Sequence, residues 1–308
     1  MREARPAGVR LQTGDARPDP ARYEVLVAGR PSAEDLDASP RLRALVIPFT
    51  GLPPATRALL HERPRIEVFN LHHNAAPVAE LAVGLLIAAA RRIVPVDAAL
   101  RRGDWRPRYE GTRGLLLDGA RAVVVGHGAI GRRVARALVA LGMAVTAVRR
   151  RPGEATTEDG VRVVGADALD AALEAAHAVV LAVPLTDATQ GLFDRARLGR
   201  LARGAVLVNV ARGDVVDEDA LYEALASGRL GGAGLDVWWR YPERVASRSA
   251  TRPSARPFEE LDTVVLSPHR GGHADATERL RAAHLADLLG RLARGGDVDG
   301  RVDPEAGY

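Results

Sequence analysis

Arg212, Asp236 and His269 each stand at or just beyond the end of an apolar run in this chain of 308 residues. A guanidinium can hold a carboxylate in bidentate geometry, an imidazole transfers protons near neutral pH, and a carboxylate can accept from a carboxamide or orient a neighbour. Taken singly, each type also has an ordinary structural use. Ligands of open α/β sheets bind outside the carboxyl ends of the strands, so the three residues together predict a site for a carboxylate-bearing molecule.

A glycine-rich turn precedes these residues in the chain. The apolar run 122–125 leads into Gly126-His127-Gly128-Ala129-Ile130-Gly131, a G-x-G-x-x-G pattern that opens an amphipathic segment. Gly126 permits the tight turn, Gly128 lets backbone N–H groups approach a pyrophosphate, and Gly131 lets the helix pack close to its strand. The helix N-terminus at Ala129 and Ile130 faces the phosphates. With a second apolar run at 144–148, the pattern predicts a dinucleotide-binding βαβ unit.

Arginines stand where NAD-preferring folds place an acidic residue for the ribose hydroxyl. Arg149, Arg150 and Arg151 follow the second run, and no carboxylate is among them. A guanidinium can grip a 2′-phosphate that an aspartate would repel. The sequence therefore favours NADP(H), and NAD(H) is the alternative. Composition alone could also account for these arginines, because all 43 basic residues of the chain are arginine.

Composition excludes several kinds of chemistry. Without lysine there is no pyridoxal Schiff base, lysine nucleophile or P-loop lysine, and without cysteine there is no disulfide, thiol catalysis or cysteine metal site. The net charge of +4 is not gathered in a long basic run, so we expect no nucleic-acid binding. The opening residues carry no apolar signal region, and the longest apolar segment, 81–90, is too short to span a bilayer. We therefore expect a cytoplasmic protein that binds no membrane.

The alternation of apolar strand-like runs with helical segments predicts two α/β units. Strands near 23–28, 42–48 and 66–70 alternate with short helices, and a long apolar helix follows at 77–92. A polar stretch, 101–114, leads into the second unit. Further strands then form a doubly wound parallel sheet of about seven strands: they are expected at 161–164, 178–183, 205–209, 232–237 and 263–267. We expect the terminal helix, 277–294, to return to the first unit.

The chain resembles the D-isomer-specific 2-hydroxyacid dehydrogenases over nearly its whole length. The resemblance rests on seven blocks in the family's order: Val78-Ala79-Glu80-Leu81, the glycine turn 126–131, Gly142-Met143-Ala144-Val145, Val183-Pro184-Leu185-Thr186, Asn209-Val210-Ala211-Arg212-Gly213, Leu235-Asp236-Val237 and Ser267-Pro268-His269-Arg270-Gly271-Gly272. It implies an α/β protein of two domains, a Rossmann doubly wound parallel sheet and a smaller flavodoxin-like α/β substrate domain. On this reading, residues 1–96 and 276–308 form the substrate domain and residues 97–275 the dinucleotide-binding domain.

The family resemblance also implies an activity and a site. It implies the reversible reduction of a 2-keto acid to a D-2-hydroxy acid, with Arg212 as the carboxylate anchor and His269 as the acid/base. The implied cofactor residues are Val183, Pro184, Val210, Ala211, Asp236 and Gly271, beside the glycine turn, Arg149 and Arg150. The implied substrate residues, besides Arg212, are Thr50, Gly51, Leu52, His72 and His73. A homodimer through the nucleotide domain is implied as well.

Two departures from the family pattern concern this site. Tyr241 stands where the family has the glutamate that pairs with the histidine, and Glu243 is near enough to substitute if the turn differs. A neutral tyrosine can bond an imidazole but cannot favour its charged form as a carboxylate does. His72 and His73 lie in an unusual loop, where they could bond a polar substrate tail; a metal site is less favoured because no third ligand is evident, and we expect none.

Two questions stay open on the sequence alone. The arginine-rich insertion 244–256 reads either as an exposed loop or as a basic flap that favours a substrate with a second anionic group. The missing glutamate also leaves two other functions: a formate dehydrogenase-like activity, although those relatives have glutamine there, and a catalytically quiet protein that senses dinucleotides.

Overall fold

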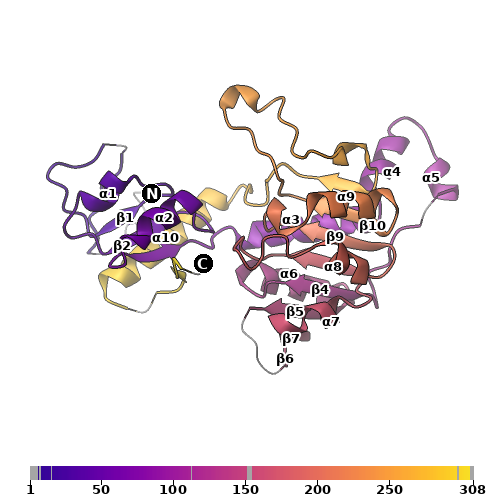
Figure 1. Cartoon of the computed structure of the whole chain (residues 1–308), viewed down its shortest axis with the longest axis horizontal. Coiled ribbons are helices and arrows are strands. Elements are labelled where there is room, and N and C mark those ends of the chain that lie inside the picture. The colour runs from indigo at the N-terminus through magenta and orange to yellow at the C-terminus, as the bar shows by residue number, and fades with distance from the viewer. Residues whose placement is uncertain are drawn as a thin grey trace. The chain divides into compact units, whose positions relative to one another are not determined.

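The computed structural model describes residues 6, 8–14, 16–111, 113–150, 155–296 and 298–305. Its contacts divide the chain into two compact units, residues 1–74 with 273–308, and residues 75–272 (Figure 1). The sequence-based boundary at residue 96 therefore differs from the observed one at residue 74. Residues 75–96 join the larger unit because the long apolar helix α3 (Ala75–Ala90) packs on α6, β9 and β10 of that unit.

The larger unit is built on a sheet of eight strands in the order β11-β10-β9-β8-β4-β5-β7-β6. Its first strand, β4, lies between β5 and β8, and the later strands run outward from it in both directions, which is the order of a Rossmann fold. Seven strands are parallel, and β6 pairs antiparallel with β7 at the edge. The strands are β4 (Arg121–Val125), β5 (Ala144–Arg149), β6 (Thr156–Glu158), β7 (Val161–Gly165), β8 (Ala178–Leu181), β9 (Ala205–Asn209), β10 (Leu230–Leu235) and β11 (Val264–Leu266).

Helices cover both faces of this sheet (Figure 1). Because side chains alternate along a strand, Ala122 and Val124 of β4 enter one core with α3 and α6, whereas Val123 and Val125 enter another with α7, α8 and α9. The remaining helices of the unit are α4 (Ile93–Leu100), α5 (Arg106–Tyr109), α6 (Ala129–Ala140), α7 (Leu169–Leu173), α8 (Arg195–Arg200) and α9 (Glu218–Ala226), with short 3-10 turns at η2 (Ala166–Ala168), η3 (Gly213–Val215), η4 (Val245–Ser247) and η5 (Phe258–Glu260).

Helix α3 approaches β10 very closely. A Cβ built on Gly234 would lie 2.7 Å from the Cβ of Leu85, and one built on Gly232 would lie 3.6 Å from the Cβ of Ala89. The tightest contact of a Cβ on Gly232 would be with the Thr263 carbonyl oxygen at 2.8 Å. The helix at Gly234 and a neighbouring carbonyl at Gly232 therefore leave no room for side chains on this part of β10.

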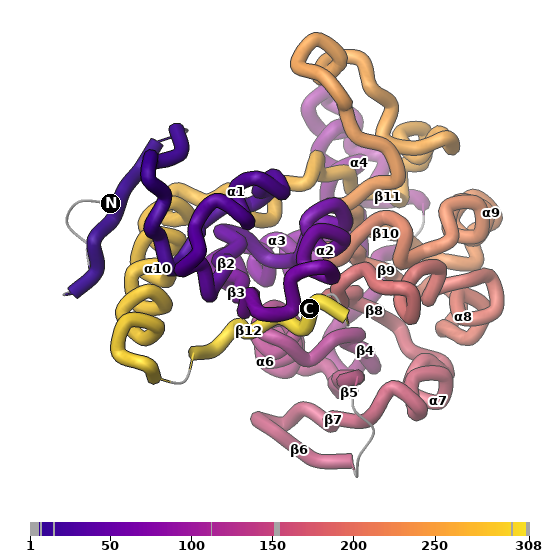
Figure 2. Tube along the Cα trace, turned by 60° about the vertical axis from the view of Figure 1, so that its left-hand side comes forward, coloured from indigo at the N-terminus to yellow at the C-terminus, as the bar shows by residue number. Residues whose placement is uncertain are grey.

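The smaller unit has a four-stranded sheet in the order β1-β2-β3-β12, with β12 antiparallel to β3. Its elements are β1 (Val25–Val27), α1 (Ala33–Asp37), β2 (Ala44–Ile47), α2 (Pro54–His61), β3 (Glu67–Asn70), α10 (Thr277–Ala293) and β12 (Arg301–Val302). Helix α10 lies along one face of this sheet (Figure 2). Its Leu288 and Leu292 pack there with Val46 and Phe69, and α1 and α2 pack on the other face.

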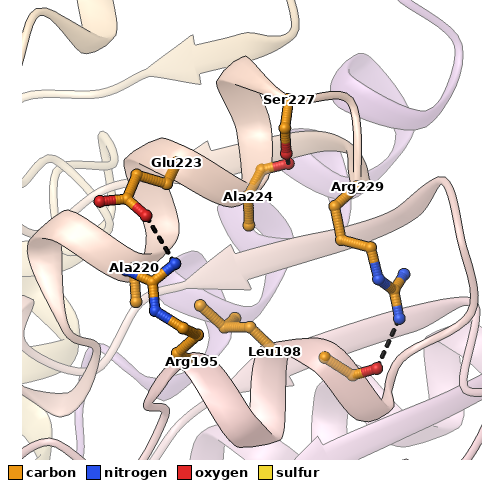
Figure 3. Close-up of a pocket in the computed structure, with 8 residues that line it drawn as sticks. Arg195, Leu198, Ala220, Glu223, Ala224, Ser227 and Arg229 are labelled. Carbon is orange, nitrogen blue, oxygen red and sulfur yellow. Dashed lines mark hydrogen bonds and ion pairs between the residues drawn. The ribbon is translucent and has the colours of Figure 1, made fainter.

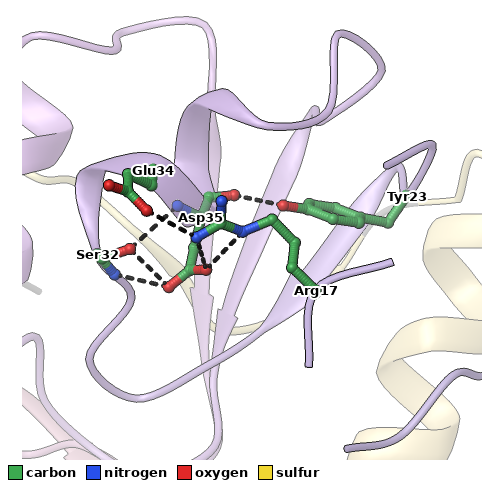
Figure 4. Close-up of polar contacts among 5 residues, drawn as sticks. All are labelled: Arg17, Tyr23, Ser32, Glu34 and Asp35. Atoms are coloured by element: carbon green, nitrogen blue, oxygen red, sulfur yellow. Dashed lines mark hydrogen bonds and ion pairs between the residues drawn. The ribbon is translucent and has the colours of Figure 1, made fainter. Parts of the chain in front are cut away.

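Helix α1 shows how short elements are held in this unit. Ser32 and Asp35 form a capping box: the Ser32 hydroxyl accepts from the Asp35 N–H at 3.1 Å, and the Asp35 carboxylate accepts from the Ser32 N–H at 2.9 Å. Arg17 pairs with Glu34 and Asp35, and the Tyr23 hydroxyl donates to the Asp35 carbonyl (Figure 4).

The sequence did not predict α4 and α5. Helix α4 lies before the polar stretch 101–114 and α5 lies within it, and the apolar side chains of both are largely exposed. The insertion 244–256 is mostly exposed, and its end is attached to α9, because Ser254 and Ala255 donate to Glu218 and Arg256 pairs with Asp219 at 2.6 Å. Within the described part of the chain, every helix is too short or too polar to cross a bilayer.

Candidate active site

The ends of β9, β10 and β11 lie side by side. The Asp236 N–H donates to the Asn209 carbonyl at 3.0 Å, and the Ser267 N–H donates to the Leu235 carbonyl at 2.8 Å, so pairing continues to the last residue of each strand. The polar residues that follow the three strands therefore meet at one edge of the sheet, as the sequence predicted from their positions.

Asp236 organises the turn that carries His269. Its buried carboxylate accepts from the Ser267 hydroxyl at 2.5 Å, from the Arg270 N–H at 2.7 Å and from the Gly271 N–H at 2.9 Å. Both carboxylate oxygens are thus engaged within the protein. The sequence left open whether Asp236 accepts from a cofactor or orients a neighbour, and this geometry favours orientation.

His269 has left-handed backbone geometry, with a φ of 59°. Such a conformation costs a residue with a Cβ about 1–2 kcal/mol, and it persists only where the surroundings over-determine it. The two N–H groups directly after His269 are the ones that Asp236 holds. The carboxylate therefore sets the direction in which the imidazole leaves the chain.

Tyr241 contacts the imidazole. Its hydroxyl lies 3.0 Å from His269 Nδ1 and accepts from the Trp238 N–H at 3.2 Å. Glu243 is exposed two residues further on, so the hydrogen bond to the imidazole comes from the residue in the glutamate's sequence position. Burial raises the pKa of the Tyr241 phenol, which the Trp238 N–H and the Arg212 charge partly oppose, so the hydroxyl is neutral at pH 7.

Arg212 lies at the same edge. Its backbone is held by Asn209, whose amide donates to the Arg212 carbonyl at 2.9 Å, and its guanidinium donates to the Ala211 carbonyl at 2.6 Å. The guanidinium is near enough to Tyr241 to lower the pKa of the phenol. The Arg212 guanidinium and the His269 imidazole thus share a small region of the larger unit.

The glycine turn has the geometry of a phosphate cradle. Gly126 has a φ of 102°, and a Cβ on Gly131 would fall within bonding distance of the Gly126 carbonyl oxygen, so the start of α6 must pack directly on the turn. A Cβ on Gly128 would meet nothing within 4 Å. The N–H groups of Ala129 and Ile130 begin α6 beside this open space, where a pyrophosphate fits.

Arg149 ends β5, and its Nε is buried with no hydrogen-bond partner among the described residues. A buried guanidinium nitrogen without a partner is unusual and suits an anionic ligand. Arg150 follows and is exposed, and Arg151 lies outside the described residues.

The other predicted cofactor residues follow β8 and β9 or lie near Asp236. Val210, Ala211 and Gly271 are buried. Val183 is partly buried against a core, and the Pro184 carbonyl accepts from the Thr189 hydroxyl at 2.7 Å.

Two loops of the smaller unit bring the predicted substrate residues together. Thr50 follows β2, and its hydroxyl contacts the Leu71 carbonyl at 3.0 Å and the Asn74 side-chain oxygen at 2.9 Å. This links the loop of Gly51 and Leu52 to the loop of His72 and His73, which follows β3.

His73, like Arg149, has a buried polar atom without a hydrogen-bond partner among the described residues. Its Nε2 accepts from Arg281 Nε at 3.3 Å, so Nδ1 carries the proton of the neutral ring, and that buried nitrogen has no partner among the described residues. Burial lowers the pKa values of both His72 and His73, and nearby His284 and, for His73, Arg281 act in the same direction. Both rings are therefore neutral hydrogen-bonding groups at pH 7. The described residues include no set of three or more His, Asp or Glu side chains placed to hold a metal ion.

Sequence reasoning missed two contributors. Ser267 precedes His269 by two residues and bonds Asp236, and Glu158 on β6 lies near His127 of the glycine turn. No sequence signal placed Glu158 there, because β6 is three exposed residues without periodicity. A surface hollow between α8 and α9 contains none of the predicted site residues: its walls include Arg195, Leu198, Ala220, Glu223 and Arg229 (Figure 3).

Comparisons with known proteins identify sequences and folds that are similar to this chain. Residues 83–271 match the sequence profile of the D-isomer specific 2-hydroxyacid dehydrogenase, NAD binding domain. The chain is 34% identical over 220 residues to D-3-phosphoglycerate dehydrogenase of Methanocaldococcus jannaschii, covering 71% of this chain but only 39% of that protein. It is 34% identical over 225 residues to hydroxypyruvate reductase of Thermotoga maritima, covering 73% and 69%.

A solved structure resembles the fold over both units. The D-isomer specific 2-hydroxyacid dehydrogenase of Xanthobacter autotrophicus, in complex with NADPH and MES, superimposes with a TM-score of 0.76 at 29% identity. The match covers 99% of this chain and 90% of that one. The predicted two-domain α/β fold with a Rossmann sheet is confirmed.

Replacing Asp236 should destabilise the larger unit measurably. Asp236→Asn turns one acceptor into a donor that faces a backbone N–H, so we expect a loss of about 1–3 kcal/mol in the free energy of unfolding. Ser267→Ala removes one bond from the same carboxylate and should cost less. Chemical denaturation measures both, with exposed Asp262→Asn as the matched control. Equal stability of Asp236→Asn and Asp262→Asn would contradict the assigned role.

Proposed function

Because the chain belongs to the family of D-isomer-specific 2-hydroxyacid dehydrogenases, we propose that it reduces a 2-keto acid to a D-2-hydroxy acid with NADPH, reversibly. The observation that carries the proposal is the meeting of Arg212, Tyr241 and His269 at one sheet edge. The relative from Thermotoga is named a hydroxypyruvate reductase, which is the same class of reaction.

The residues of the larger unit fit a bound NADPH. The backbone between Gly126 and Gly131 would hold the pyrophosphate, and Arg149 with Arg150 would hold the 2′-phosphate, since Arg149 Nε is buried without a partner among the described residues. The NADPH named in the Xanthobacter structure supports the same choice. When bound, the nicotinamide supplies the hydride that reduces the carbonyl carbon.

The protein supplies orientation and a proton. Arg212 binds the carboxylate of the keto acid in bidentate geometry and so presents one face of its carbonyl. His269, protonated, donates to the carbonyl oxygen as the alkoxide develops, and Nε2 is the donor because Nδ1 faces Tyr241. The Tyr241 hydroxyl can accept a hydrogen bond from a protonated Nδ1 or donate one to a deprotonated Nδ1. It can therefore hold the His269 ring in either protonation state of this nitrogen.

The smaller unit and a second copy complete the proposal. We assign Thr50, Gly51, Leu52, His72 and His73 to substrate binding, which the unpartnered His73 Nδ1 among the described residues supports. We also propose a homodimer through the larger unit. The exposed apolar side chains of α4 and α5 support it, among them Val94 at 49% and Tyr109 at 77% exposure. Sedimentation equilibrium tests the dimer, and a monomer at micromolar concentration would exclude it.

Cofactor preference is the first expected outcome. The value of kcat/KM with NADPH should exceed that with NADH by at least about tenfold, the effect of one additional charge-assisted contact. Arg149→Asp should reverse or abolish this preference, whereas Arg203→Asp, an exposed arginine elsewhere in the unit, should leave it unchanged. Steady-state rates followed at the NADPH absorbance band measure both. Equal use of the two cofactors by the wild-type protein would refute the assignment of Arg149 and Arg150.

Anchoring and proton transfer should separate by mutation. Arg212→Ala should raise KM for small 2-keto acids severely and leave NADPH affinity nearly unchanged. His269→Gln should lower kcat by roughly 10²- to 10⁴-fold with a smaller effect on KM. Nucleotide binding by both variants controls for folding. An active His269→Gln enzyme would remove the mechanism, and a wild-type protein that binds NADPH but reduces no 2-keto acid would favour a sensing role.

The pH dependence of reduction tests Tyr241. Reduction needs His269 protonated, so kcat/KM should fall as pH rises through the pKa of the imidazole. A carboxylate at position 241 favours the charged ring, so Tyr241→Glu should move this alkaline limb to higher pH by about one unit or more. Tyr241→Phe should perturb the limb, and Glu243→Gln should not. A downward shift in Glu243→Gln with none in Tyr241→Phe would make Glu243 the partner instead.

A further inference from the structure

His127 is a buried titratable residue inside the glycine turn that the proposed reaction does not use. It occupies the position after Gly126, and its side chain is only 6% exposed. Its Nδ1 lies 3.9 Å from a carboxylate oxygen of Glu158, which β6 carries. His127 directly precedes Gly128, where a Cβ would meet nothing within 4 Å, so the imidazole belongs to the turn that we propose holds the pyrophosphate.

Charged groups from three elements act on this imidazole. Glu158 comes from β6, Arg132 from α6 and Arg149 from the end of β5. Arg132 Nε donates to the His127 carbonyl at 3.3 Å, so this arginine is held at the turn. The Gly126 N–H donates to the Val148 carbonyl at 2.9 Å, so His127 and Arg149 follow the paired ends of β4 and β5. The buried Nε of Arg149 has no partner among the described residues.

Burial and these charges together leave the ring neutral in the nucleotide-free protein at pH 7 and above. Burial lowers the pKa of His127, the Glu158 charge raises it, and the charges of Arg132 and Arg149 lower it further. A phosphate monoester carries about two negative charges above pH 7. Placed among these charged groups, it would offset both arginines and favour the imidazolium.

We propose that His127 is a second recognition residue for the 2′-phosphate of NADPH, neutral in the free protein and protonated in the complex, with Glu158 positioning the protonated ring. NADPH then binds together with a proton, whereas NADH, without the 2′-phosphate, does not. The choice between the two cofactors consequently depends on pH. This inference rests on the proposed NADPH assignment and names a residue outside it.

Isothermal titration calorimetry of the whole protein tests the inference without turnover. NADPH and NADH are titrated between pH 7 and 8.5, where the 2′-phosphate is ionised, in two buffers of different ionisation enthalpy, which reports the protons taken up. For the wild-type protein we expect proton uptake with NADPH and none with NADH. The affinity for NADPH should weaken by roughly three- to thirtyfold across this range, since one fully coupled proton changes it about tenfold per pH unit.

The variants separate His127 from its neighbours. His127→Gln should bind NADH normally, which shows that the turn is folded, but should bind NADPH without proton uptake and with a flat pH dependence. Glu158→Gln removes the charge that favours the imidazolium, so its proton uptake should occur at lower pH. His273→Gln, an exposed histidine, is the matched control and should behave as wild type.

Two negative results have different meanings. Proton uptake that persists unchanged in His127→Gln overturns this inference while leaving NADPH preference intact. An Arg149→Ala variant that discriminates between NADPH and NADH as well as wild type does overturns the proposed cofactor assignment itself. The Glu158→Gln result then decides the carboxylate's part: a pH profile identical to that of the wild type removes Glu158 from the proposal.

Discussion

The carboxylate of Asp236 is the constraint on which the proposed active site depends. It is buried directly after β10, the neighbour of edge strand β11, and it accepts from a hydroxyl and two successive N–H groups of the turn that follows β11. That turn carries His269 in a left-handed conformation that its own sequence does not favour, since no glycine stands there. The backbone strain lies at His269, and the hydrogen bonds that offset it come from Asp236, which follows another strand. The direction of the imidazole therefore depends on the assembled sheet.

Much of this architecture was predictable because it follows from local patterns. The glycine turn, the alternation of apolar runs and the polar residues after each run predicted the Rossmann sheet and the gathering of Arg212 and His269 at one edge. Tyr241 was predictable as the contact of His269 only through the resemblance to a family, because nothing local distinguishes it from Glu243. The roles of these residues stay predictions, whereas the family and the fold are confirmed.

What could not be predicted depends on contacts between segments far apart in the sequence. Helix α3 is apolar on nearly every side, so its periodicity could not say which unit it joins, and its contacts with β9 and β10 decide that. Glu158 reaches the glycine turn from an edge strand of three exposed residues. The sequence allowed Asp236 either to accept from a cofactor or to orient a neighbour. The positions of the Arg270 and Gly271 N–H groups favour the second role.

The closeness of α3 to β10 also has an evolutionary consequence. Gly234 lies against the helix, and a Cβ on Gly231 or Gly232 would meet the carbonyl oxygen of Gly204 or Thr263, respectively. Every single-nucleotide change of a glycine codon that alters the residue adds at least a Cβ, so drift along this strand meets the helix or a carbonyl whichever way it goes. The strand that precedes Asp236 is thus restricted by packing before any selection on chemistry acts. The same packing fixes where this strand ends relative to the ends of β9 and β11. Variation in substrate preference must then come from the loops, which can change without moving the strand that supports them.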